Sequence, residues 1–117
     1  MTLDGTRIYL VGGRESVLLD PGPDEDGLEE LWTELAEGTD VAAVALTHAH
    51  PDHAGGARRA AALFDVPLAA SPRALRRLSA DGRPLREGAD LPVDGGESRL
   101  RALETPGHSP DHLCFLR

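Results

Sequence analysis

The chain has 117 residues, which suits a single domain with one core, and its aromatic content of 3% means that this core must consist mainly of Ala, Val and Leu. The formal net charge of −8 argues against a general nucleic-acid binder, which normally carries a basic face. No apolar run approaches the roughly 20 residues of a transmembrane helix, the polar start has no signal-peptide core, and the single cysteine leaves no internal disulfide. We therefore expect a cytoplasmic protein without a membrane partner.

The first third of the chain predicts a β-hairpin followed by a helix. Residues 7–11 and 16–20 are strand-like, and Gly12 and Gly13 between them supply the positive φ angles of a tight turn. Residues 24–38 show helical spacing, because one stripe at i, i+3, i+4 and i+7 is apolar. That stripe consists of Leu28, Leu31, Trp32 and Leu35.

The middle of the chain alternates predicted strands and helices. Residues 41–46 are apolar on both faces, as in a buried central strand. Residues 54–64 predict an Ala-rich helix and residues 66–70 a short strand. Ser71-Pro72 is typical of an N-cap followed by proline at the first helical position, and this helix should end near Ser79.

The last third is expected to contain fewer elements. Residues 81–96 are rich in turn residues, residues 98–103 alternate as a half-buried strand, and residues 113–116 begin a last apolar strand. Strands alternating with helices predict an α/β protein, and the hairpin makes its sheet mixed.

Three arginines share one face of the predicted helix after Ser71. They are Arg73, Arg76 and Arg77. We interpret them as a solvated helical face, and binding of an anionic substrate is the alternative.

Residues 48–53, His-Ala-His-Pro-Asp-His, form the most informative segment of the chain. In extended backbone His48 and His50 point the same way and can close on one ion. A helix that starts after Pro51 would let Asp52 and His53 offer ligands to a second ion. Imidazole and carboxylate suit Zn, Fe or Mn. All five histidines lie here or in one other short stretch, which favours a metal site over a solvated polar loop.

These residues resemble the metallo-β-lactamase-fold hydrolases. Residues 47–53 match the HxHxDH signature of that family, residues 105–112 are similar to its TPGH(S/T)xxH segment, and residues 9–22 resemble its opening hairpin and acidic turn. The resemblance implies an αβ/βα sandwich with a dinuclear metal centre at one edge. Here it would comprise about one half of that sandwich, with a mixed sheet and flanking helices.

The resemblance also implies the ligands. His48, His50 and His108 would hold the first ion and Asp52 and His53 the second, with zinc the expected metal at both positions and iron or manganese as alternatives. Three imidazoles leave a position open for water, as in a catalytic zinc site, and two ions can share a hydroxide and hold a substrate oxygen. Asp52 would orient that hydroxide or accept a proton.

Two further residues are expected to support the ligands. Asp20 matches an acid that lies beneath the metal site in the family, and its alternative role is that of an Asx-type turn residue. His112 is expected to have a hydrogen-bonded structural role, with support of a ligand as the alternative. Thr47 either steers the ligand segment or simply ends a strand.

The family also has a bridging aspartate and one more histidine further along the fold, and neither has a counterpart in residues 1–117. We therefore expect a partial domain, in which the inner face of the sheet and a strand edge are uncovered. Three explanations remain open: a fragment of a longer hydrolase, a short form completed by a second copy or another chain, or a remnant that catalyses nothing.

The resemblance implies a metal-dependent hydrolase acting on a small-molecule ester, thioester, amide or phosphodiester, closer to the glyoxalase II-like branch than to the antibiotic-cleaving branch. Two alternatives are a mononuclear iron oxidoreductase of the persulfide dioxygenase kind and a non-enzymatic metal-binding module.

Overall fold

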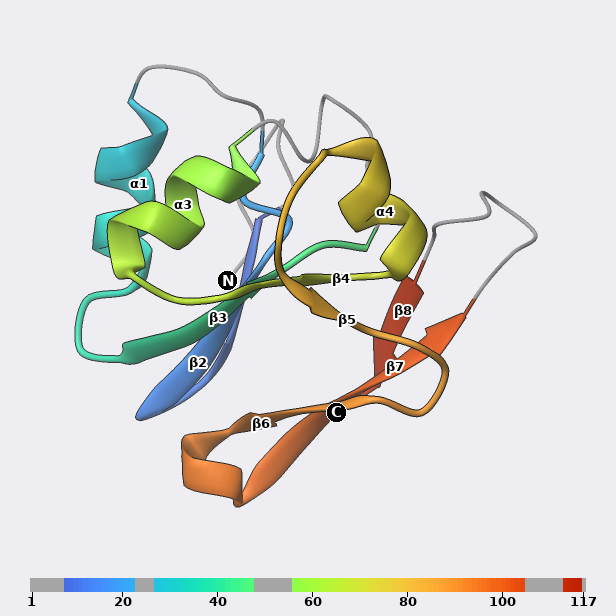
Figure 1. The fold of residues 1–117 in the computed structure, drawn as a ribbon. Helices are drawn as coiled ribbons and strands as arrows, with labels where there is room; N and C mark the ends of the chain where they lie inside the picture. Colours follow the sequence, from blue (N-terminus) through green and yellow to red (C-terminus); the bar gives the residue numbers. More distant parts are fainter. Residues whose placement is uncertain (1–7, 23–26, 48–55, 105–112, 117) are drawn as a thin grey trace.

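A computed structural model describes residues 8–22, 27–47, 56–104 and 113–116. These residues form two β-sheets, three α-helices and one short 3-10 helix, which confirms the predicted mixed α/β fold (Figure 1). In chain order the elements are β1 (Tyr9–Gly12), β2 (Glu15–Leu19), α1 (Leu28–Leu35), β3 (Asp40–Ala45), α3 (Ala57–Phe64), β4 (Leu68–Ala70), α4 (Pro72–Arg77), β5 (Arg83–Pro84), β6 (Asp90–Val93), the 3-10 helix η1 (Asp94–Gly96), β7 (Ser98–Glu104) and β8 (Leu113–Leu116).

The larger sheet has the strand order β1-β2-β3-β4-β5. Strand β1 is antiparallel to β2, and β2 through β5 are parallel to one another. In this register Ala45 of β3 lies opposite both Leu19 of β2 and Ala69 of β4. Strand β3 is therefore central, as its apolar sequence predicted, and the smaller sheet is antiparallel with the order β6-β7-β8.

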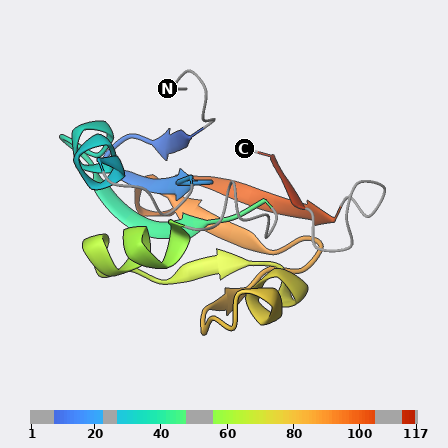
Figure 2. The same cartoon turned by 90° about the horizontal axis from the view of Figure 1, so that it is seen from above.

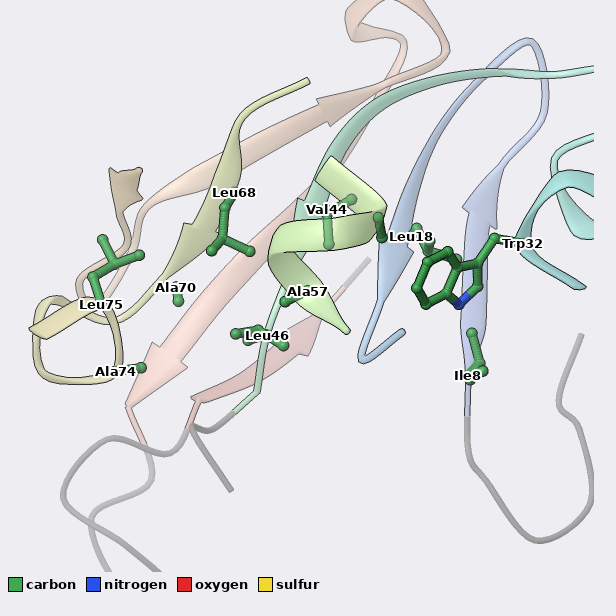
Figure 3. Close-up of a cluster of buried hydrophobic side chains, with 11 residues drawn as sticks. Ile8, Leu18, Trp32, Val44, Leu46, Ala57, Leu68, Ala70, Ala74 and Leu75 are labelled. Atoms are coloured by element: carbon green, nitrogen blue, oxygen red, sulfur yellow. The ribbon is translucent and has the colours of Figure 1, made fainter. Parts of the chain in front are cut away.

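The two faces of the larger sheet are covered by different layers. Helices α1, α3 and α4 lie on one side, and the smaller sheet lies on the other (Figures 1 and 2). The cluster on the helix side is drawn in Figure 3 and is built around Leu18, Trp32, Val44, Leu46 and Leu68.

A second cluster fills the space between the sheets. Val17, Leu19 and Ala45 of the larger sheet pack there with Leu91 and Leu100 of the smaller one. The expectation of an uncovered inner face was therefore wrong for the larger sheet, because the chain's own strands β6 and β7 bury it. Strands β6 and β7 pack against residues of β2 and β3 that are distant in sequence, and local patterns do not reveal such packing.

Strand β6 lies within residues 81–96, where only turns were predicted. Leu91 and Val93 are buried and Pro92 between them is exposed, so the strand has the usual two-residue alternation. Proline lacks a ladder donor and is confined to strand edges, and β6 is an edge strand. The proline made the sequence of an edge strand resemble a turn.

Helix α1 is shorter than predicted within the described residues. It begins at Leu28 after Gly27, whose φ is 91°, and it ends at Leu35 rather than at Gly38. Trp32 on its inner face is fully buried, as the apolar stripe predicted. No helix among the described residues is long and apolar enough to cross a membrane.

Asp94 connects the smaller sheet to the first hairpin. Its Oδ1 atom accepts hydrogen bonds from the backbone N–H groups of Gly13 at 2.7 Å and Glu15 at 3.3 Å. Asp94 has a φ of 51°, a left-handed conformation that Asp tolerates better than most residues. This carboxylate fixes the turn between β6 and β7 against the turn between β1 and β2.

Candidate metal centre

The candidate site lies at the carboxyl edge of the parallel strands. Asp20 follows β2, Thr47 follows the end of β3, and Ser71 follows β4. Because these strands are parallel and in contact, their carboxyl ends meet at one edge of the sheet. The predicted ligands His48, His50, Asp52 and His53 come directly after Thr47 in the chain, and they lie outside the described residues.

The carboxylate of Asp20 is bound by Thr47 through both oxygens. Oδ1 accepts the Thr47 backbone N–H at 2.9 Å, and Oδ2 accepts the Thr47 hydroxyl at 2.9 Å. The Asp20 backbone N–H donates to the carbonyl of Ala45 at 2.9 Å. Asp20 is 9% exposed and has a φ of 50°. The Asp20 side chain therefore bonds across the sheet to the residue that precedes His48.

The turn formed by residues 20–22 also holds the other end of the motif segment. The Gly56 backbone N–H donates to the carbonyl of Gly22 at 2.7 Å, and Gly56 is the N-cap of α3. Thr47 and Gly56 are the described residues on either side of residues 48–55. A single turn thus fixes both flanks of the segment that carries four of the predicted ligands.

Helix α1 holds this turn through a hydrogen bond from Trp32. The Trp32 indole Nε1–H donates to the carbonyl of Pro21 at 2.8 Å, and Trp32 is fully buried. Sequence reasoning assigned Trp32 to the core and missed this bond. The available signal was chemical, because a buried indole N–H needs an acceptor.

The second histidine segment, residues 105–112, joins β7 to β8. His108 and His112 belong to it and lie outside the described residues. The last residue of β7, Glu104, pairs with the first residue of β8, Leu113. Figures 1 and 2 show these strand ends on the same side of the molecule as the carboxyl end of β3. The described ends of β3, β7 and β8, which flank the two histidine segments in sequence, therefore lie on one side of the fold.

The donor set fits a metal centre of the zinc type. Among the described residues no three His, Cys, Asp or Glu side chains converge on one point, as expected when all five histidines lie in the other segments. Neutral imidazoles with one carboxylate are the ligands that Zn, Fe and Mn accept in proteins. Among the described residues, the Asp20 carboxylate accepts hydrogen bonds from Thr47 on both oxygens.

A hollow of about 690 Å³ lies elsewhere, at the amino end of β4. Arg58, Asp65, Pro67 and Gly82 are among its lining residues. It opens at the edge of the sheet opposite to Thr47, and no described lining residue is a predicted site residue.

A sequence model of the metallo-beta-lactamase superfamily matches residues 1–117, and the chain therefore belongs to this superfamily. Among similar curated proteins, an "Atrochrysone carboxyl ACP thioesterase" of Aspergillus terreus is 37% identical over 98% of this chain and 36% of its own length. The "Lactamase-like protein aptB" of Emericella nidulans is 37% identical over 99% of this chain and 37% of its own length. The chain thus spans little more than a third of the length of these relatives.

Solved structures agree on the fold. The BLEG-1 B3 metallo-beta-lactamase is 27% identical with a TM-score of 0.72, and the match covers 94% of this chain and 61% of that one. ETHE1 from Myxococcus xanthus is 26% identical with a TM-score of 0.75, over 95% of this chain and 47% of that one. The metallo-β-lactamase fold predicted from residues 47–53 and 105–112 is confirmed.

Proposed function

We propose that this chain contributes the metal-binding motifs of a metal-dependent hydrolase that cleaves thioesters of an acyl carrier protein. The observation that carries the proposal is the turn at residues 20–22, which holds Thr47 on one side of the histidine segment and Gly56 on the other. Fixing both flanks restricts the conformations of the segment between them, and preorganised ligands bind metal more tightly.

The proposed ligands follow the family pattern. His48, His50 and His108 hold the first ion, and Asp52 and His53 hold the second, with zinc as the proposed metal at both. When bound, such ions supply a nucleophile from water at neutral pH and a Lewis acid for the substrate carbonyl. Asp52 moves a proton during the reaction, and Asp20 supports the segment through Thr47.

The names of relatives favour a thioester among the ester, thioester, amide and phosphodiester substrates considered. The Aspergillus terreus relative is named as an ACP thioesterase, and a second such thioesterase, from Pseudocercospora fijiensis, is 34% identical over 98% of this chain. Hydrolysis would release a carboxylic acid and return the carrier thiol. A cytoplasmic location remains a prediction.

We also propose that residues 1–117 form one part of a metallo-β-lactamase domain. The proposal is supported by the coverage of only 36% of the Aspergillus terreus relative. A bridging carboxylate and a further histidine would then come from residues outside this sequence, either in the same polypeptide or in a second chain.

Metal content tests the proposal first. The purified chain is examined by elemental analysis, its mass in solution by light scattering, and its activity on an acetylated acyl carrier protein. We expect bound zinc, lost in His48→Ala and in His50→Ala, and thioester hydrolysis once the rest of the domain is present, either in the same polypeptide or as a second chain. A zinc-loaded complete domain that leaves the thioester intact contradicts the substrate, and bound iron with oxygen uptake on a persulfide supports the iron alternative instead.

A further inference from the structure

The helix layer carries opposite charges at its two ends. Helix α1 contains three glutamates and no basic residue, whereas α4 contains three arginines and no acidic residue. Figures 1 and 2 show α1 and α4 on opposite sides of α3. A chain with a net charge of −8 therefore presents a local basic surface at α4, which we call the α4 arginine face (Arg73, Arg76 and Arg77).

The arginines of this face point away from the core. Ala74 and Leu75 are buried, at 0% and 7% exposure, while Arg73, Arg76 and Arg77 are exposed. The spacing i, i+3 and i+4 puts the three arginines on one side of the helix. The predicted solvent-facing surface is thus confirmed. All three of its charged side chains are positive, and the next question is why.

Helix stability explains only part of the arrangement. Arg76 and Arg77 lie in the last turn of α4, where a cation interacts favourably with the helix dipole. Arg73 is the second residue of the helix, where the helix dipole does not favour a cation. Arg73 is also exposed, so neither the helix dipole nor packing in the core accounts for its charge.

Helix α4 begins at the same edge of the sheet as Thr47, the last described residue before the predicted ligands. Ala45 of β3 pairs with Ala69 of β4. The first predicted ligand, His48, follows Ala45 by three residues, and the first residue of α4, Pro72, follows Ala69 by three residues. The ends of β3 and β4, which precede the motif segment and α4 in the sequence, therefore lie at the same level of the sheet.

We propose that the α4 arginine face docks an acidic surface of the carrier protein whose thioester the site hydrolyses, an inference that rests on the proposed function. The partner that complements this face would present an acidic surface to the arginines and its thioester to the site. Two acidic proteins repel at long range, so productive encounter needs a local basic surface close to the site. Nucleic acid is the less favoured occupant, because it would meet a net charge of −8 elsewhere on the chain.

The test compares two substrates that carry the same acetyl group. One is an acetylated acyl carrier protein, and the other is the small thioester acetyl N-acetylcysteamine. In the zinc-loaded full chain, Arg73→Glu with Arg76→Glu should lower kcat/KM for the carrier substrate by about tenfold or more relative to the small thioester. The difference should shrink as salt is raised, because screening weakens exposed charge pairs.

The matched control is Arg14→Glu. Arg14 has an 80% exposed side chain with an ion pair to Glu97 at 3.7 Å, and it precedes β2 at the opposite edge of the sheet. Reversing this charge alters the net charge as much as one α4 reversal, and the ratio of carrier to small-thioester activity should stay unchanged. An equal loss in Arg14→Glu and in Arg73→Glu would overturn the proposal, because only the total charge would then matter.

A binding measurement separates this inference from the proposed function. Labelled carrier protein is titrated with the chain by fluorescence anisotropy, without turnover. Binding that weakens in the Arg73→Glu, Arg76→Glu double variant supports docking even if neither thioester is hydrolysed, in which case the proposed function alone has failed. No binding by the unaltered chain, unchanged binding by the double variant, or tighter arginine-dependent binding of a single-stranded RNA oligonucleotide would each overturn the docking proposal.

Discussion

Asp20 and Thr47 are joined by two hydrogen bonds of 2.9 Å, one from the Thr47 backbone N–H and one from its hydroxyl. The residues are 27 positions apart and end neighbouring parallel strands. A buried carboxylate that accepts two donors holds its partner firmly, because breaking either bond leaves a desolvated charge less well satisfied. The pair therefore fixes where the chain enters the histidine segment.

Asp20→Asn should destabilise the protein by about 1–3 kcal/mol and weaken zinc binding by about tenfold or more. Asparagine tolerates the φ of 50° at this position, so the variant changes the hydrogen bonds without straining the backbone. One amide oxygen remains as an acceptor, and the other acceptor is replaced by a donor. Urea unfolding followed by tryptophan fluorescence gives the free energy, and a zinc titration gives the affinity.

Thr47 provides the matched variants. Thr47→Ser keeps both donors and should behave as the unaltered chain, whereas Thr47→Val removes only the hydroxyl and should cost about 1 kcal/mol. In the double variant with Asp20→Asn the losses should be less than additive, because both changes break one interaction. Full additivity, with zinc affinity unchanged throughout, would show that the pair does not act on the motif segment.

Trp32→Phe should destabilise the chain by about 1–3 kcal/mol, because the carbonyl of Pro21 loses its indole donor in a buried position. Phenylalanine keeps most of the apolar contact in the cluster of Figure 3. Circular dichroism must follow this unfolding, since the chain has one tryptophan. Thr33→Ala on the exposed side of α1 is the control and should stay within about 0.5 kcal/mol. Equal stability of the two variants would mean that the indole bond contributes nothing.

Local sequence patterns predicted most elements of the larger sheet and its helices. The alternation of Leu100 and Ala102 with arginines predicted strand β7, and the structure buries those two residues. Apolar residues on both faces predicted the central position of β3. Such signals are short-range, because the spacing of apolar residues within a short segment indicates which strand face or helix stripe is buried.

Long-range relationships were not accessible in the same way. From the sequence, Asp20 could be either a turn residue or a residue that supports the site. Its hydrogen-bond partner Thr47 is brought close by the pairing of β2 with β3. The smaller sheet covers the larger one through contacts such as Val17 with residues of β6 and β7, which no local pattern encodes. The ligand roles of His48, His50 and Asp52 remain predictions.

Ser71→Ala should cost about 1 kcal/mol of stability, within a range of about 0.5–2 kcal/mol. The Ser71 hydroxyl accepts the backbone N–H of Ala74 at 3.1 Å, and Pro72 follows at the first helical position, as the sequence predicted. Ser71→Thr retains an acceptor and should restore most of the loss. Because this cap holds the first turn of α4, carrier-protein binding should weaken in Ser71→Ala and recover in Ser71→Thr. Unchanged stability in Ser71→Ala would show that Pro72 alone secures the turn.

The two histidines of residues 105–112 should differ in their effect on metal content. His108→Ala removes a proposed ligand of the first ion, and we expect bound zinc to fall and thioester hydrolysis to be lost. His112→Ala removes a histidine with an expected structural role, and we expect zinc content to stay the same while stability falls. The pair is well matched, because both histidines lie between β7 and β8 and the substitution is identical. Elemental analysis after dialysis against metal-free buffer measures the outcome. Zinc lost from His112→Ala and retained by His108→Ala would exchange the two roles and correct the proposed ligand set.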